Sequence, residues 1–218
     1  MKRLFFTLLT ASVLLTACQS DKTSDQSTES TETTDASQEG FVFQPAFTDL
    51  TWTAFKTTAR KEVNGTFKEM EIKPGSEAGH VTDILNGLTF SMKTSSVFSN
   101  DAGRDAKLIA NFFGTMTGTE YIKGKVTSVE GNDDGGTAKI AITLNEVEHE
   151  VSATYTRMGK VISLETSLDM AHWNATTSIE ALNKVCELLH TGDDGVSKLW
   201  PDVKVVVNST VKGDVPAS

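Results

Sequence analysis

Apolar and polar residues alternate with a period of two along most of the chain after residue 40. Five stretches show this pattern, and their apolar faces consist of Leu50, Trp52 and Ala54; Leu88, Phe90 and Met92; Ile140, Ile142 and Leu144; Val147, Val151, Ala153 and Tyr155; and Val203, Val205 and Val207. Such alternation predicts strands with one buried face, which is typical of an antiparallel sheet. All sixteen glycines and all four prolines lie at or after residue 40. They separate the strands at regular intervals, as in a sandwich or a closed barrel.

Turn residues join several of these stretches. The segment Gly131–Gly136 predicts a flexible hairpin loop, and Met158-Gly159-Lys160 predicts a tight turn. Trp200-Pro201 is expected at the start of the last strand, where proline is tolerated.

Two segments follow a helical period instead. We expect the first helix between Asn100 and Gly114, opened by Asn100 or Asp101. Its apolar residues are Leu108, Ile109, Phe112 and Phe113.

The second helix is expected between Thr177 and Gly192. Thr177 with Glu180 predicts a capping box, and Gly192 predicts the C-terminal end. The apolar stripe of this helix consists of Ile179, Leu182, Cys186 and Leu189. The sequence thus predicts a mainly β domain with two short helices.

The first seventeen residues have the pattern of an export signal. Lys2 and Arg3 precede an apolar run from Leu4 to Leu15, which is too short for a membrane span of about 20 residues. The run ends in Leu15-Thr16-Ala17-Cys18, which resembles the lipobox of bacterial lipoproteins. This resemblance implies a fatty-acylated membrane anchor, such as palmitate, at Cys18. Gln19 after the cysteine implies the outer membrane of a Gram-negative bacterium, on either its periplasmic or its surface face.

Residues 18–40 form the expected lipidated cysteine and its tether. From residue 19 to 39 nearly every position is Ser, Thr, Asp, Glu or Gln, with one basic and six acidic residues. Because such a segment has little apolar surface to bury, we expect an acidic, disordered spacer, with a partner-binding tail as the alternative. Residues 41–218 are left as the folded domain.

Charge and composition narrow the function. The chain is 38% hydrophobic, enough for a sizeable core, and its formal net charge is −9. Residues 41–218 hold 17 basic and 23 acidic residues and carry −6 of this charge. An acidic domain argues against nucleic acid as a partner and against electrostatic attraction to anionic membrane surfaces.

No pattern of catalytic, cofactor-binding or metal-binding residues stands out. Cys18 and Cys186 are the only cysteines, so a disulfide framework is excluded. We find no nucleophile elbow and no phosphate-binding glycine loop, and we expect neither an enzyme nor a cofactor. The four histidines lack short metal-binding spacing. For His149 a core or channel position is the simpler interpretation, and a long-range metal site with His172 is the alternative.

Several motifs resemble those of the YceI-like family. Thr53-Ala54-Phe55-Lys56 leads into Val63-Asn64-Gly65-Thr66-Phe67 as in the opening strands of that family. A closer match is Ser95-Ser96-Val97-Phe98-Ser99, then Gly103-Arg104-Asp105-Ala106-Lys107-Leu108 and Asn111-Phe112-Phe113. The segments Asn145–Glu150, Leu189–Gly195 and Leu199–Val203 depart from the usual pattern and indicate a lipoprotein branch.

The resemblance implies a lipocalin-like antiparallel β-barrel of about eight strands around an apolar channel. The implied ligand is a long-chain apolar molecule of the polyisoprenoid, quinone or fatty-acid type. We take the large apolar residues on alternating faces as candidates for the channel wall, with a filled core as the alternative. They are Trp52, Phe67, Phe90, Met92, Phe98, Phe112, Phe113, Ile140 and Ile142.

Arg104 is the candidate for a polar head group of the ligand, because guanidinium suits phosphate. A structural role is favoured for this residue: Asp105 would complement the helix dipole, and Arg104 would pair with a nearby acid. We expect an envelope lipoprotein that transports, stores or sequesters its ligand. The alternatives are an accessory module that presents a quinone-like lipid to a membrane protein partner, and a packed scaffold.

Overall fold

The structure is a computed structural model, and it describes residues 40–214. The predicted signal peptide, Cys18 and nearly all of the tether lie outside these residues. The strands are β1 (Phe41–Lys56), β2 (Lys61–Phe67), β3 (Met70–Lys73), β4 (Ala78–Gly79), β5 (Thr89–Lys93), β6 (Val97–Phe98), β7 (Tyr121–Gly131), β8 (Gly135–Leu144), β9 (Val147–Met158), β10 (Val161–Asp169) and β11 (Leu199–Lys212). The helices are α1 (Val81–Leu85), α2 (Ala102–Asn111), α3 (Thr176–Val185) and α4 (Glu187–His190), with short 3₁₀ turns at Thr94–Ser96, Phe113–Thr115 and Met170–Trp173.

One antiparallel sheet contains all of these strands. Its order is β3-β5-β7-β8-β9-β10-β11-β1-β2-β6, and β4 pairs with β1. From β7 to β11 each strand pairs with the next along the chain, as expected for strands joined by short hairpins. The last strand, β11, then pairs with the first, with Trp52 opposite Val205.

The two ends of the sheet, β3 and β6, are joined by the chain itself. Strands β2 and β3 are separated only by Lys68 and Glu69, and β5 and β6 only by the 3₁₀ turn Thr94–Ser96. Between these bends the Lys68 N–H donates to the Ser96 carbonyl at 3.0 Å, and the Lys93 N–H donates to the Glu69 carbonyl at 3.0 Å. If β2–β3 and β5–β6 are each counted as one bent strand, the sheet closes into a barrel of eight strands. The predicted fold class is confirmed.

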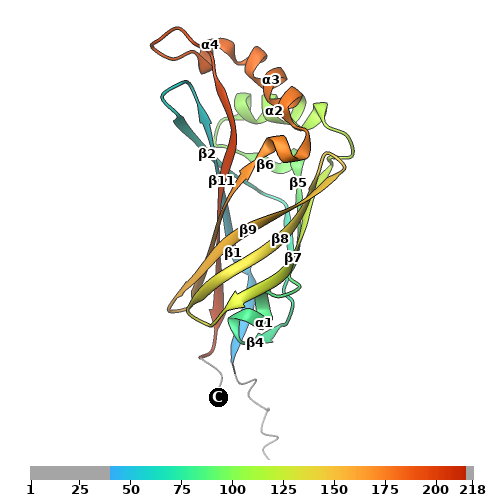
Figure 1. The fold of residues 1–218 in the computed structure, drawn as a ribbon, viewed down its shortest axis with the longest axis vertical. Helices are drawn as coiled ribbons and strands as arrows, with labels where there is room; N and C mark the ends of the chain where they lie inside the picture. Colours follow the sequence, from blue (N-terminus) through green and yellow to red (C-terminus); the bar gives the residue numbers. More distant parts are fainter. Residues whose placement is uncertain (1–39, 215–218) are drawn as a thin grey trace, which may run out of the picture. The chain divides into compact units, whose positions relative to one another are not determined.

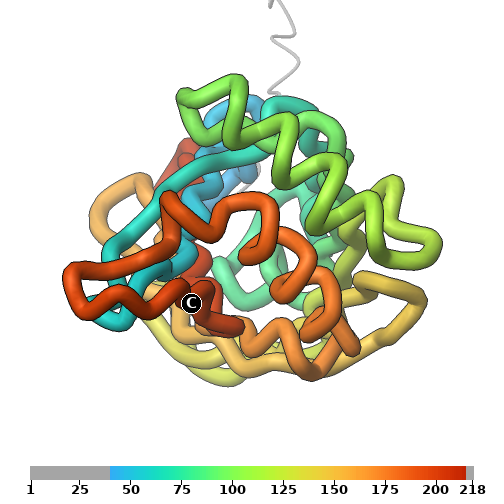
Figure 2. The backbone as a smooth tube through the Cα atoms, turned by 90° about the horizontal axis from the view of Figure 1, so that it is seen from above, coloured from blue at the N-terminus to red at the C-terminus, as the bar shows by residue number. Residues whose placement is uncertain are grey.

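Helices gather at the two ends of this barrel. Figure 1 shows α1 and β4 at one end and α2, α3 and α4 together at the other. Helix α1 closes its end: Val81 and Ile84 are fully buried and pack with Phe41, Phe43 and other residues of one apolar cluster. Viewed from the opposite end, α3 and α4 (orange) cross the end of the barrel, and α2 (green) lies along its edge (Figure 2).

The first predicted helix is confirmed, and its first turn explains where it begins. The Asp101 side chain accepts a hydrogen bond from the Arg104 N–H at 2.9 Å, so Asp101 is the N-cap of α2. Asp105 lies in the first turn, and its carboxylate accepts a hydrogen bond from the Ser99 N–H at 2.8 Å.

The second predicted helix is two helices, and its predicted capping box is wrong. Helix α3 follows Ala175, which makes no side-chain cap, because the 3₁₀ turn and the left-handed Asn174 (φ 55°) lead straight into the helix. Cys186 (φ −116°, ψ 14°) separates α3 from α4, which ends at His190 rather than at Gly192. Helix α1 was not predicted, because five residues are too few to show a helical period.

Both predicted hairpin connections are found. Gly159 (φ 60°) lies in the tight turn between β9 and β10. The loop between β7 and β8 is held on two sides: the Tyr155 hydroxyl donates to the Asn132 carbonyl at 2.8 Å, and the Asp133 carboxylate accepts from the Val81 N–H at 2.7 Å. Between residues 40 and 214 no helix has the length and hydropathy needed to cross a membrane.

Candidate functional site

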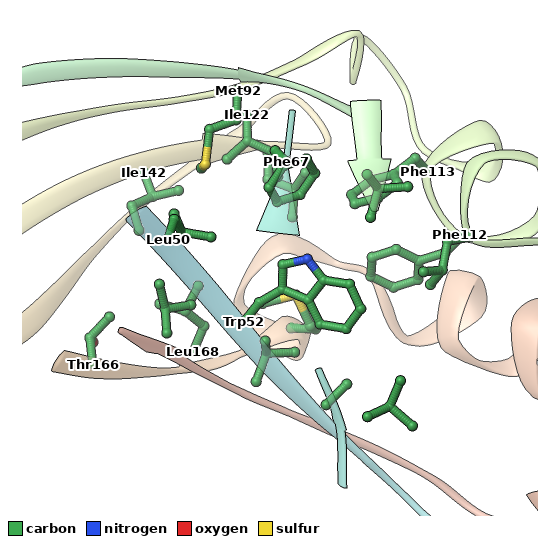
Figure 3. A pocket seen from close by; sticks show the side chains of 18 of the residues that line it. Leu50, Trp52, Phe67, Met92, Phe112, Phe113, Ile122, Ile142, Thr166 and Leu168 are labelled. Atoms are coloured by element: carbon green, nitrogen blue, oxygen red, sulfur yellow. The ribbon is translucent and has the colours of Figure 1, made fainter. Parts of the chain in front are cut away.

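A cavity of about 440 Å³ occupies the interior of the barrel. Ligand pockets typically have volumes of about 300–1,000 Å³. The walls are inward-facing residues of the strands other than β4 and β9, and the helical end contributes α2, α3, α4 and the Phe112–Phe113 segment that follows α2. Figure 3 shows Trp52 on β1 facing Phe112, with Phe67 and Phe113 beside them.

Strand β11 indicates how far this cavity extends. Its lining residues run from Leu199 at the helical end to Ser209 toward the end that α1 closes. At a rise of about 3.3 Å per residue, this stretch of strand is about 33 Å long. The cavity lining therefore follows most of the length of β11.

Eight of the nine channel candidates line this cavity. The predicted inward positions of the strands and of the Phe112–Phe113 segment therefore line a single cavity. These eight residues are Trp52, Phe67, Phe90, Met92, Phe112, Phe113, Ile140 and Ile142.

Phe98 is the exception, because the strand changes face before it. Phe90 and Met92 line the cavity at even positions, but the 3₁₀ turn Thr94–Ser96 shifts the alternation, so Val97 lines the cavity next. Consecutive strand residues point to opposite faces. Phe98 therefore lies on the other face, with the Lys68 ammonium 3.6 Å from its ring centroid.

Indole N–H groups of the cavity wall are hydrogen-bonded to backbone carbonyls. The indole N–H of Trp52 donates to the Thr66 carbonyl at 3.2 Å, and that of Trp173 donates to the Ile142 carbonyl at 2.9 Å. In the part of the chain that the structure describes, no buried side-chain nitrogen or oxygen lacks a hydrogen-bond partner. The wall therefore offers apolar surface and favours a ligand whose body is a hydrocarbon chain.

Two glycines set the positions of the largest wall side chains. Gly65 pairs with Trp52 and Gly124 with Phe90 across neighbouring strands. A Cβ atom would lie 2.1 Å from Trp52 Cζ2 at Gly65, and 2.2 Å from Phe90 Cζ at Gly124. Each ring thus lies directly over a glycine. Glycine within a strand often marks such a close approach.

Among residues 40–214, charged side chains line the cavity only at its helical end. They are Lys56 at the end of β1 and Asp101, Arg104 and Lys107 on or beside α2, with His190 of α4 near them. We call this end, defined by these five residues, the mouth. The Lys56 ammonium donates to the Leu189 carbonyl at 3.0 Å and so links β1 to α4.

Arg104 makes the local pairing that was predicted for it and also lies at the cavity. Its guanidinium lies 3.6 Å from the Asp101 carboxylate and donates to the Ser99 carbonyl at 3.3 Å, as the structural interpretation predicts. Its side chain is 38% exposed and also lines the mouth. The local pairing therefore holds the guanidinium at the cavity rather than away from it.

Burial and neighbouring charges shift two pKa values at the mouth. Burial lowers the pKa of Lys56, and the positive charges of Lys61 and Arg104 lower it further. Burial also lowers the pKa of His190 to about 4, with smaller contributions from Lys56 and Lys107. His190 is therefore neutral at pH 7, and the positive charge of the mouth comes from Lys56, Arg104 and Lys107.

Lys56 and Lys107 were not predicted as site residues, although the sequence contains a signal for each. Lys56 continues the even-numbered inward face of Leu50, Trp52 and Ala54. Lys107 follows Arg104 by three residues and so lies on the same face of α2.

His149 and His172 come together, with ring centroids 4.0 Å apart beside Trp173. Within residues 40–214, no group of three or more His, Cys, Asp or Glu side chains is placed to hold a metal ion. Cys186 is buried and lines the cavity as a free thiol.

Comparisons with known proteins agree with this architecture. The sequence model of the YceI-like domain matches residues 41–211. A polyisoprenoid binding domain from Saccharophagus degradans, implicated in plant cell wall breakdown, is similar in structure with a TM-score of 0.56 and 11% identity, over 81% of this chain and 99% of that one. BcnA from Burkholderia cenocepacia is similar with a TM-score of 0.55 and 8% identity, over 78% of this chain and 99% of that one. No curated protein matches the sequence.

Proposed function

Because the chain belongs to the YceI-like family, we propose that its barrel binds one long-chain apolar molecule of the polyisoprenoid, quinone or fatty-acid type. The observation that carries this proposal is the cavity of about 440 Å³, which is apolar along its length and charged only at one end. The Saccharophagus degradans protein of similar fold is described as polyisoprenoid-binding.

Burial of the chain is the driving force in this proposal. Each methylene removed from water contributes about 0.8 kcal/mol. Association also costs about 4–15 kcal/mol in lost translational and rotational freedom, so a long chain is needed for a net gain. Transport, storage or sequestration requires binding and release alone, without bond breaking.

The proposal extends to where the protein acts. Cys18 would carry the lipid anchor, residues 19–40 would serve as the spacer, and the barrel would stand near the outer membrane of a Gram-negative bacterium. The Leu15–Cys18 motif and Gln19 support this placement. A lipid-anchored carrier would take up and release its ligand close to a bilayer.

A pair of neighbouring substitutions on β10 tests the proposed cavity. Leu168 lines the cavity, whereas Ser167 is exposed on the opposite face. We expect Leu168→Trp to fill the cavity and to weaken binding of retinol, a fluorescent isoprenoid alcohol, by about tenfold or more, equivalent to about 1.4 kcal/mol. Ser167→Trp adds the same side chain outside the barrel and should bind retinol as wild type does.

Stability measurements distinguish a filled cavity from a damaged barrel. Filling an empty cavity typically adds about 0.5–2 kcal/mol to the free energy of unfolding. Leu168→Trp should therefore unfold at the same or a higher urea concentration than wild type in the absence of retinol. Equal retinol affinity in both variants would contradict the proposed function.

A further inference from the structure

We propose that the ligand is an amphiphile with an anionic head group, a phosphate or a carboxylate, which binds Lys56, Arg104 and Lys107 at the mouth while its chain fills the apolar cavity. This inference rests on the proposed function and specifies the chemical class of the ligand.

The three cations converge on the mouth from two elements. Lys56 ends the inward face of β1, and Arg104 and Lys107 lie one helical turn apart on α2. All three line the same cavity, and Leu108, beside them on α2, lines it as well. A ligand that leaves the apolar wall at this end therefore meets the cationic groups next.

The positive charge at the mouth is not balanced by carboxylates. Among the described residues Asp101 is the one acidic side chain that lines the cavity, and it already accepts the Arg104 N–H and pairs with the guanidinium at 3.6 Å. Lys56 and Lys107 form no ion pair within residues 40–214. The mouth thus has a formal excess of positive charge on a chain whose net charge is −9.

Some lysines on strands of the described domain, unlike those at the mouth, pair with a carboxylate. Lys93 pairs with Glu69 at 3.1 Å, and Lys139 pairs with Glu150 at 3.4 Å. Lys204 pairs with Glu165 at 3.5 Å. On these strands a lysine faces a carboxylate, whereas at the mouth the side chains of Lys56 and Lys107 face the end of an apolar cavity.

The partial burial of the mouth favours an anion there. Burial and the charges of Lys61 and Arg104 lower the pKa of Lys56, so an arriving negative charge would relieve a repulsion that is already present. Charge-assisted hydrogen bonds are about twice as strong as neutral ones, and Arg suits the oxygens of phosphate and carboxylate. A neutral head group gains little of this interaction.

Two pairs of ligands test the head group separately from the chain. Farnesyl phosphate and farnesol share one chain, and palmitate and hexadecanol share another. We expect purified protein to bind the anionic member of at least one pair about tenfold or more tightly than the neutral member, as charge-assisted hydrogen bonds at a partly buried site imply. The pair with the larger ratio identifies the head group as phosphate or carboxylate.

Matched variants place the effect at the mouth. Lys56→Gln combined with Lys107→Gln should reduce the ratio of the affinities for the anionic and neutral members to about twofold or less. The affinity for the neutral member should stay within about twofold of wild type, because the apolar wall is unchanged. Lys107→Gln alone should lower the ratio partially, and it retains the hydrogen bond from Lys56 to the Leu189 carbonyl. Lys123→Gln with Lys125→Gln makes the same charge change on the exposed face of β7 and should keep the wild-type ratio.

The possible outcomes separate the two proposals. Equal affinity for both members of each pair would overturn the anionic head group and leave the proposed function standing. A ratio that the mouth variants do not change, or that the β7 control also reduces, would overturn the assignment to Lys56, Arg104 and Lys107. Binding of none of the four ligands would overturn the anionic head group together with the isoprenoid and fatty-acid classes of the proposed function.

Discussion

Glycines opposite aromatic rings shape the cavity at the scale of single residues. Phe90 lies across Gly124 on the neighbouring strand, where a Cβ atom would come within 2.2 to 2.9 Å of three ring carbons. Both residues lie within paired strands, so their backbones cannot move apart without disturbing the sheet. The size of the cavity therefore depends on a residue without a side chain.

Gly124→Ala should destabilise the protein and reduce ligand binding. The new methyl group forces the Phe90 ring toward the cavity, and overpacking of this kind costs typically about 1–3 kcal/mol. The free energy of unfolding in urea and the affinity for retinol measure the two effects. The matched control is Gly103→Ala in the first turn of α2, where the Cβ would meet only Asp101 Oδ1 at 3.4 Å.

In that control, alanine should raise the free energy of unfolding by up to about 1 kcal/mol, since glycine is the poorer helix former. If Gly124→Ala proved as stable as Gly103→Ala, the close packing of Phe90 on Gly124 would be wrong.

At the scale of elements, the two predicted helices begin in different ways. Helix α2 has a side-chain cap from Asp101, whereas α3 follows a 3₁₀ turn and uses none. Thr177 is exposed and already one residue inside α3. The hydrogen bonds of the first turn therefore do not depend on its hydroxyl.

We expect Thr177→Ala to leave the free energy of unfolding within about 0.5 kcal/mol of wild type. Asp101→Ala should lower it by a clearly larger amount, because the Arg104 N–H loses its partner. Asp101→Asn keeps a capping oxygen and should recover most of that loss. Urea unfolding of the three variants measures this order, and a large effect of Thr177→Ala would restore the predicted capping box.

The connection between α1 and the β7–β8 loop has its own pH dependence. His80 Nδ1 lies 2.9 Å from the Asp133 carboxylate. This hydrogen bond and the negative charge of Asp133 raise the pKa of His80. Burial alone would raise the pKa of Asp133, but hydrogen bonds from His80 and the Val81 N–H outweigh it, and the pKa is lowered.

These two pKa shifts determine how the stability of the fold changes with pH. The contribution of His80 is fully present below its unfolded pKa of about 6.5 and is lost as the pH rises through the higher folded value. The contribution of Asp133 to stability is lost only in acid, as the pH falls through the lowered pKa of Asp133 in the folded protein. The interaction therefore stabilises the fold most at mildly acidic pH.

Wild type should lose more stability than His80→Gln when the pH is raised from about 5.5 to about 8.5. Comparing the two proteins cancels the opposite trend of His190, whose pKa is lowered to about 4. Thermal unfolding at the two pH values measures the difference. Identical pH dependence in both proteins would contradict the role of His80.

Alternation predicted five of the eleven strands that the structure describes, β1, β5, β8, β9 and β11, with their inward faces, whereas β7 and β10 were not predicted. Other predictions failed where the period was interrupted. The 3₁₀ turn Thr94–Ser96 moved Phe98 out of the cavity, and Cys186 divided a helix that the apolar stripe had joined. Closure of the barrel depends on hydrogen bonds between the bends at Lys68–Glu69 and Thr94–Ser96, which are distant from each other in sequence.

The candidate site was predicted in its apolar part and only partly in its charged part. Large apolar side chains on an inward face have few alternatives to the interior. A lysine at the end of such a face, such as Lys56, is equally compatible with solvent. Only the convergence of β1, α2 and α4 shows that it borders the cavity.

At the scale of the whole domain, the barrel combines one closed end with one charged mouth. Fully buried Val81 and Ile84 of α1 pack at the closed end, and the groups around α2 and α4 line the mouth. This polarity gives the proposed ligand one orientation, with its chain directed toward α1. The central claim is that the space between the two ends holds a long apolar molecule.

The most direct test is native mass spectrometry of the gently purified protein, before and after extraction with organic solvent. We predict one discrete added mass per chain that solvent removes and that fragments as a long-chain amphiphile. Leu168→Trp should lack this mass, and Ser167→Trp should retain it. A protein that carries no added mass, and that then fails to bind isoprenoids, quinones and fatty acids supplied to it, would contradict the account.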